Sequence, residues 1–172
     1  IEKFKTLLVV KSSLISLYLA LTIPIPLISI EELKNISIIL FFLGLYLIIN
    51  ITSDYVEISN DKLTYVTTFV SNLFGKKSWE VFWKDIKLIE SSSTSQGSKV
   101  YYFITYEDKK YLVPQRVENL KEFLSLILER TGIETKEMDY ISPMWTYKLL
   151  TLLSLFMILG EIISFFSKYY LR

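Results

Sequence analysis

The chain has 172 residues, of which 51% are hydrophobic and 22% charged, and its mean hydropathy is +0.37. This hydropathy exceeds that of a water-soluble domain of the same length and predicts a membrane protein. The sequence contains no His and no Cys, which excludes imidazole bases, thiolate nucleophiles and zinc sites built from these residues. Five widely spaced glycines exclude a phosphate-binding loop, and a net charge of +1 offers no field to attract nucleic acid. We therefore expect a protein that is not an enzyme and has no catalytic residue, metal or cofactor.

The first part of the chain, residues 1–52, is predicted to form a transmembrane hairpin. An apolar stretch starts at Leu7 and continues without a charge from Leu14 to Ile30, which is long enough to cross a hydrocarbon core of about 30 Å. Two prolines, at 24 and 26, predict a kink or the end of this helix near the far interface. After a polar break at residues 31–35, a second apolar stretch runs from Ile36 to Thr52. Because the link is so short, the two helices are expected to be antiparallel.

Residues 53–133 have the alternating pattern of a small soluble β domain. A Ser/Thr-rich segment, residues 91–99, is interpreted as a loop. From Val117 to Gly132 the apolar residues keep helical spacing and predict one amphipathic helix. The strands are expected to form a curved antiparallel sheet or a partly closed barrel. Six strands are predicted, at residues 55–58, 63–70, 76–82, 86–90, 100–106 and 110–113.

After a linker at residues 134–143, the segment 144–172 contains a third hydrophobic stretch and a tail. As a helix from Trp145 to Tyr169 it would be about 36 Å long, enough to span a membrane. The alternative is a helix that lies in the membrane interface. A spanning helix would carry Glu161 inside the bilayer, where a charge is costly. In a functional interpretation, Glu161 relays protons or ions, or forms an ion pair with a neighbouring subunit. In a structural interpretation, its side chain reaches the interface or is neutral.

Aromatic and basic residues of the β domain are the candidate partner contacts. In the strand segment from Tyr101 to Ile104 both faces are apolar, so either the sheet is covered on both sides or one face meets a protein partner. Basic residues around the third and fourth strands are candidates to touch lipid headgroups or acidic partners, or else form a solvated strand edge. The candidate contacts are Trp79, Trp83, Tyr102, Lys76 and Lys77.

This order of elements resembles the bacterial membrane-anchored pleckstrin-homology-like (PH-like) family. The resemblance covers Leu14 to Gly132 and is carried by three segments: Tyr55 to Val70 with its turn at Asn60-Asp61-Lys62, Val81 to Ile89, and Val117 to Gly132. It implies an α+β membrane protein in which a PH-like domain follows a membrane hairpin. The layout is also similar, more weakly, to the photosystem I assembly factor of cyanobacteria and plastids, which has no third hydrophobic segment after the domain. Both resemblances imply a non-enzymatic scaffold, assembly or accessory role.

The leading functional hypothesis is an accessory or assembly subunit that docks on a larger membrane complex, in a bacterial cytoplasmic or thylakoid membrane. Its partners would be the lipid bilayer and other integral membrane proteins, with no role for nucleic acid. The alternative is a membrane-anchored sensor whose domain binds lipid headgroups or a small ligand. A transporter subunit that uses Glu161 ranks third. A mild excess of Lys and Arg near the membrane ends predicts that the domain faces the cytoplasm or stroma.

Overall fold

The computed structural model describes residues 1–95 and 97–170, without the side chains of the last two. It divides into two compact units. The sheet unit consists of Ile1–Leu7 and Ser53–Pro143, and the helical unit of Leu8–Thr52 and Met144–Arg172. The chain thus enters the sheet unit twice. The division at residue 53 coincides with the predicted boundary. Residues 1–7, predicted as part of the hairpin, and residues 134–143, predicted as a separate linker, belong instead to the sheet unit.

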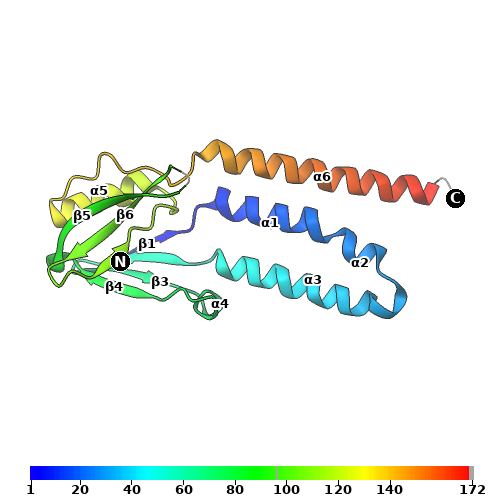
Figure 1. Cartoon of the computed structure of the whole chain (residues 1–172), viewed down its shortest axis with the longest axis horizontal. Helices are drawn as coiled ribbons and strands as arrows, with labels where there is room; N and C mark the ends of the chain where they lie inside the picture. Colours follow the sequence, from blue (N-terminus) through cyan, green and yellow to red (C-terminus); the bar gives the residue numbers. More distant parts are fainter. Residues whose placement is uncertain (96, 171–172) are drawn as a thin grey trace. The chain divides into compact units, whose positions relative to one another are not determined.

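The helical unit contains α1 (Leu8–Thr22), α2 (Pro24–Ile28), α3 (Glu31–Ile51) and α6 (Met144–Tyr170) (Figure 1). Among the residues that the structure describes, three helical stretches are long and apolar enough to cross a membrane, at Leu8–Ile28, Glu31–Ile51 and Met144–Lys168. The three predicted hydrophobic helices are therefore present. The second begins at Glu31, earlier than predicted, because the polar residues 31–35 are helical too. Glu31 and Glu32 lie in its first turn, where acidic side chains interact favourably with the helix dipole. The third is one continuous helix.

Small side chains form the buried face of α1, which packs against both α3 and α6. Ser13, Ser16 and Ala20 are buried on α1, and Ser154 is buried on α6. The spacing of 13, 16 and 20 places the three on one side of the helix, where small residues let helix backbones approach closely. The hydroxyls of Ser13 and Ser16 donate to carbonyls one turn back, at Val10 and Ser13, so burial leaves them hydrogen-bonded.

The contact between α1 and α3 depends on one tyrosine and one glycine. The hydroxyl of Tyr18 donates to the carbonyl of Phe41 at 2.7 Å, and the two rings lie 5.9 Å apart. A Cβ at Gly44 would overlap the hydroxyl and ring of Tyr18. Glycine at position 44 therefore makes room for the hydrogen bond.

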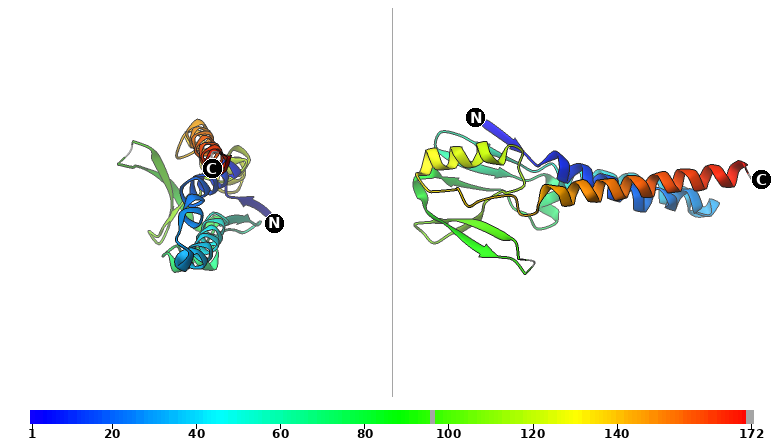
Figure 2. Two further views of the ribbon diagram at one scale, coloured as in Figure 1. Left: turned by 90° about the vertical axis from the view of Figure 1, so that its right-hand side faces the viewer. Right: turned by 90° about the horizontal axis from the view of Figure 1, so that it is seen from above.

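The sheet unit contains two antiparallel sheets where the sequence predicted one. The first has the order β1 (Glu2–Lys5), β2 (Tyr55–Ile58), β3 (Lys62–Val66) and β4 (Trp79–Phe82). After the short 3-10 helix η1 (Trp83–Asp85), the second consists of β5 (Ile86–Ser93), β6 (Lys99–Thr105) and β7 (Lys110–Leu112). The β5–β6 hairpin is seen in both views of Figure 2. The α+β class is confirmed, and each of the six predicted strand regions contains a strand.

Three predictions of local structure are corrected. Strand β1 was missed, since residues 1–52 were all assigned to the hairpin; Phe4 is its one buried residue and pairs with Val56 of β2. The predicted strand 63–70 stops at Val66, and residues 69–73 form a short helix instead. Residues 91–93, interpreted as loop, extend β5 because they pair with β6.

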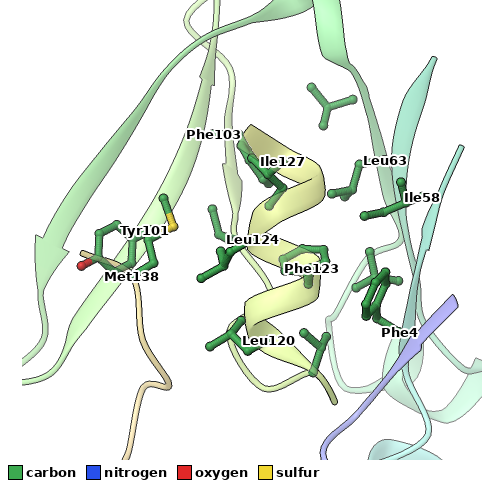
Figure 3. Close-up of a cluster of buried hydrophobic side chains, with 14 of the residues drawn as sticks. Phe4, Ile58, Leu63, Tyr101, Phe103, Leu120, Phe123, Leu124, Ile127 and Met138 are labelled. Carbon is green, nitrogen blue, oxygen red and sulfur yellow. The ribbon is translucent and has the colours of Figure 1, made fainter. Parts of the chain in front are cut away.

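The hydrophobic core of the sheet unit is built around α5 (Leu120–Thr131). Figure 3 shows this helix between side chains of the two sheets. Phe4 of β1 meets Phe123 edge-on, with ring centroids 5.4 Å apart, and Phe103 of β6 is fully buried. The helix ends at Gly132, whose φ of +70° is a conformation that glycine adopts without strain. The buried face of α5 consists of Leu120, Phe123, Leu124 and Ile127, as the helical spacing in the sequence predicted.

Candidate functional site

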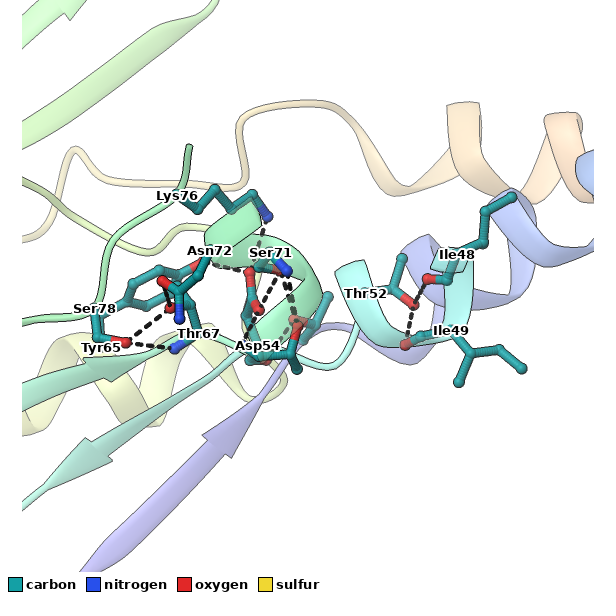
Figure 4. A network of polar contacts seen from close by, with 12 residues as sticks. Ile48, Ile49, Thr52, Asp54, Tyr65, Thr67, Ser71, Asn72, Lys76 and Ser78 are labelled. Atoms are coloured by element: carbon teal, nitrogen blue, oxygen red, sulfur yellow. Dashed lines mark hydrogen bonds and ion pairs between the residues drawn. The ribbon is translucent and has the colours of Figure 1, made fainter. Parts of the chain in front are cut away.

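The carboxylate of Asp54, just past the end of α3, is the centre of a polar network (Figure 4). Its side chain is 3% exposed. One oxygen, Oδ1, accepts hydrogen bonds from the Thr68 backbone N–H at 3.0 Å and the Ser71 hydroxyl at 2.7 Å. The other, Oδ2, accepts from the Lys76 ammonium at 2.9 Å and the Tyr65 hydroxyl at 3.2 Å. A buried carboxylate is stable only with such partners, so the network holds these four residues in place.

The network explains why residues 69–73 form a helix, α4 (Phe69–Leu73), rather than the end of a strand. Thr68 has extended backbone angles, and its hydroxyl accepts a hydrogen bond from the backbone N–H of Ser71, as an N-cap residue does. Next to it, the Thr67 hydroxyl bonds to both Asn72 and Ser78. These bonds replace the pairing with β4 that an extended strand would need.

Tyr65 has a perturbed pKa because of its position in the network. Burial raises the pKa of the Tyr65 hydroxyl well above its usual value, and the negative charge and hydrogen bond of Asp54 raise it further. The neutral hydroxyl is therefore favoured in the folded protein, where it donates to Asp54. Its ring stacks against Trp79, with centroids 5.8 Å apart.

Large apolar side chains of α4 and the turn after it point away from the core. Phe69 is 77% exposed, Leu73 70% and Phe74 66%, whereas Val70 and Ser71 are buried. We call these three exposed residues the α4 apolar patch. Lys76 and Lys77 follow directly, after Gly75 in a left-handed turn conformation.

A second exposed surface lies on the side of the β5–β7 sheet opposite the core. In the register of this sheet, Tyr102 of β6 lies between Glu90 and Leu112, while Ile104 lies between Leu88 and Lys110. The Lys110 ammonium contacts the Glu90 carboxylate at 2.9 Å across the central strand. That hydrogen bond, and the charge of Glu90, raise the pKa of Lys110. We call this surface the outer β5–β7 face. Leu88 and Leu112 are exposed on it, Val100 and Tyr102 are half-buried, and Ile104 is buried.

The structure separates the predicted partner contacts. Trp83 is buried in the core, where its indole N–H donates to the Ser59 carbonyl at 3.0 Å. Trp79 is half-buried on the inner side, against Phe103 and Tyr111. Since adjacent strand residues point to opposite faces, Tyr102 lies on the other side of β6 from Phe103.

The two lysines among the candidate contacts lie together after α4. Lys76 is bound to the carboxylate of Asp54, and Lys77 is exposed. Asp54 is not among the candidate residues predicted from the sequence. Its position directly after an apolar span, followed by the Thr67-Thr68 pair and Ser71, is the signal that could have identified it.

Glu161 lies within α6, and its Oε2 atom is buried without a hydrogen-bond partner among the described residues. The sheet unit also has an open cavity of about 650 Å³, whose mixed lining includes the charged side chains of Lys84, Arg130 and Asp61, the amide of Asn60 and several aromatic rings. Within residues 1–95 and 97–170, no three Asp or Glu side chains gather in a way that would hold a metal ion.

Comparison with known proteins identifies a relative of this chain. No family model matches the chain, and no solved structure does. The chain is 30% identical to the "Uncharacterized protein slr0269" of Synechocystis sp. over 158 residues, which is 88% of this chain and 79% of the relative. A match of this identity and length includes both the helical and the sheet unit. The chain therefore belongs to the same protein family as slr0269 of Synechocystis.

Proposed function

We propose that the protein is a non-enzymatic accessory subunit that is anchored in a membrane by α1, α3 and α6 and docks on a larger membrane protein complex. Three stretches are long and apolar enough to span: α1 together with α2, α3, and most of α6. A cyanobacterial relative supports an energy-transducing membrane, bacterial cytoplasmic or thylakoid, as the location. In this proposal the sheet unit faces the cytoplasm or stroma and contacts an extramembrane part of another integral membrane protein.

The outer β5–β7 face is the observation that carries this proposal. It combines an aromatic side chain, Tyr102, with exposed aliphatic neighbours at Leu88 and Leu112 and the ion pair between Glu90 and Lys110. An aromatic centre with aliphatic neighbours and a polar rim is the usual composition of a protein interface. The opposite side of the same sheet is already buried in the core around Phe103.

The test of docking is mild-detergent extraction from native membranes, followed by native electrophoresis and mass spectrometry. An accessory subunit should migrate in a complex much larger than its own 20.2 kDa, with the same partner in fixed stoichiometry. A protein found only as a monomer or a homo-oligomer after extraction in several mild detergents would contradict the proposal.

A ligand sensor is the second candidate function, favoured by the open cavity at Lys84 and Arg130. The cavity lining has two cationic side chains, Lys84 and Arg130, against one carboxylate, Asp61, and the amide oxygen of Asn60 lies 3.5 Å from Arg130. The excess of positive charge favours a small anionic ligand. Thermal unfolding of the full chain with and without small phosphates and dicarboxylates distinguishes the candidates. A concentration-dependent rise in melting temperature that Arg130→Gln abolishes would support the sensor.

A further inference from the structure

We propose that the α4 apolar patch is inserted into the lipid–water interface on the side of the membrane where α3 ends. In this arrangement Phe69, Leu73 and Phe74 contact the upper part of the acyl chains, and Lys77 lies at the level of the lipid phosphates. The insertion is a second membrane contact in addition to the spanning helices. It stands independently of the docking proposal, because its partner is the bilayer.

The first argument is the composition of the patch. Phe69 and Leu73 are four residues apart in α4 and so lie on one face of it, and Phe74 continues the apolar surface into the turn. Three large apolar side chains, each more than three-fifths exposed, stand next to one another while Val70 and Ser71 face inward. A short amphipathic element with such a face is typical of segments that lie in the membrane interface.

The second argument is the tether between α4 and the end of α3. Asp54 accepts hydrogen bonds from the Thr68 N–H and the Ser71 hydroxyl, at the start of α4. Asp54 follows Ile51, the last residue of α3, by three positions, so the chain alone keeps their Cα atoms within about 11 Å. The interfacial layer on each side of a bilayer is roughly 6 Å thick. If α3 spans, the first turn of α4 is therefore held within reach of that layer.

The third argument is charge. Between Lys62 and Trp79 the sequence has no Asp or Glu, while Lys76 and Lys77 follow the patch directly. Lys76 is paired with Asp54 and has a half-exposed side chain, and Lys77 is exposed. Anionic headgroups attract basic residues placed beside a membrane and would repel acidic ones. The sign of the charge around the patch therefore fits a lipid surface.

The absence of cysteine allows a direct test with the full chain. Single variants Phe69→Cys and Phe74→Cys would be labelled with an environment-sensitive fluorophore and reconstituted, without any other protein, into vesicles of phosphatidylcholine and phosphatidylglycerol. Ser95→Cys, in the exposed loop between β5 and β6, is the matched control. The measurement is quenching by lipids that carry a nitroxide near the headgroup, compared with quenching by aqueous iodide.

Insertion predicts that labels at 69 and 74 are quenched several-fold more by the nitroxide lipids than the label at 95, and are protected from iodide. Adding the change Lys77→Glu should reduce the lipid quenching in anionic vesicles more than in vesicles of phosphatidylcholine alone. The proposal is overturned if both labels are as accessible to iodide as the control. Protection that returns only in native membranes would assign the patch to a protein partner instead, and would also overturn it.

Discussion

The buried carboxylate of Asp54 is expected to contribute strongly to the stability of the sheet unit. Asp54→Ala removes the acceptor of four hydrogen bonds, which come from the Thr68 N–H, the Ser71 and Tyr65 hydroxyls and the Lys76 ammonium. Breaking a buried pair by removing one side typically costs about 3 kcal/mol or more. We expect thermal or denaturant unfolding of the purified full chain to show this loss. The control is Glu107→Gln, which removes an exposed ion pair with Lys109 and should leave the melting temperature unchanged. Equal melting temperatures for the two variants would contradict the role of Asp54.

Because its pKa is raised, Tyr65 is expected to make the free energy of unfolding depend on pH at alkaline pH. Its pKa is raised in the folded protein by burial and by Asp54, whereas in the unfolded chain it titrates near the ordinary value of about 10. Above that pH the unfolded state loses the Tyr65 proton and the folded state keeps it, so the free energy of unfolding falls as pH rises. Tyr65→Phe should make this fall shallower between about pH 10 and 12. Identical slopes for the variant and the unchanged protein would show that Tyr65 does not titrate in this way.

Replacing Gly44 should weaken the packing of α1 against α3. Gly44→Ala places a methyl group against the ring of Tyr18 and breaks its hydrogen bond to the Phe41 carbonyl. Hydrogen bonds between membrane helices are typically worth about 0.6 to 2 kcal/mol, so we expect a moderate loss of stability in detergent. Gly160→Ala, where a methyl group meets open space, is the matched control. A Gly44→Ala variant as stable as Gly160→Ala would rule out close packing at Tyr18.

The elements that sequence reasoning predicted correctly have long periodic patterns. The three hydrophobic helices and the buried face of α5 follow directly from apolar spacing. Strand β1 has only four residues with a single apolar side chain, Phe4, and becomes a strand because it pairs with β2, far along the chain. Helix α4 was missed because Phe69 and Val70 continue an alternating pattern, while the carboxylate that fixes the helix, Asp54, lies fourteen residues before Thr68.

The candidate surfaces were harder to predict than the elements. Sequence alone left both faces of the strand around Tyr102 as equal candidates for core or interface. The register decides between them, because Phe103 enters the core and Tyr102 lies opposite, beside Glu90 and Leu112. Trp83, predicted as a partner contact, is buried, and its indole N–H donates to the Ser59 carbonyl inside the sheet unit. Neither fact is encoded in residue type or spacing.

For the whole molecule, the proposed topology predicts which parts of the chain are accessible from each side of the membrane. If α1 and α3 span as a hairpin, Asn35 in the first turns of α3 and Ser95 in the β5–β6 loop lie on opposite sides. Single cysteines at these positions should react with a membrane-impermeant maleimide from opposite sides, and Ser95→Cys should react from the cytoplasmic or stromal side. Reaction of both from one side would contradict the hairpin.

The most direct test of the central claim, docking through the outer β5–β7 face, compares two neighbouring residues of β6. Tyr102→Ala and Phe103→Ala are expressed in the native membrane, with Tyr106→Ala as an exposed aromatic control. Both the amount of protein and its fraction in the large complex are measured.

Phe103 is 0% exposed, so its replacement should cost roughly 3 to 5 kcal/mol of stability and reduce protein and complex together. Tyr102→Ala should leave the amount of protein nearly unchanged and weaken docking by about 2 kcal/mol, close to 30-fold in affinity. A Tyr102→Ala protein that remains in the complex as fully as Tyr106→Ala, or that is lost from the membrane as Phe103→Ala is, would contradict the account.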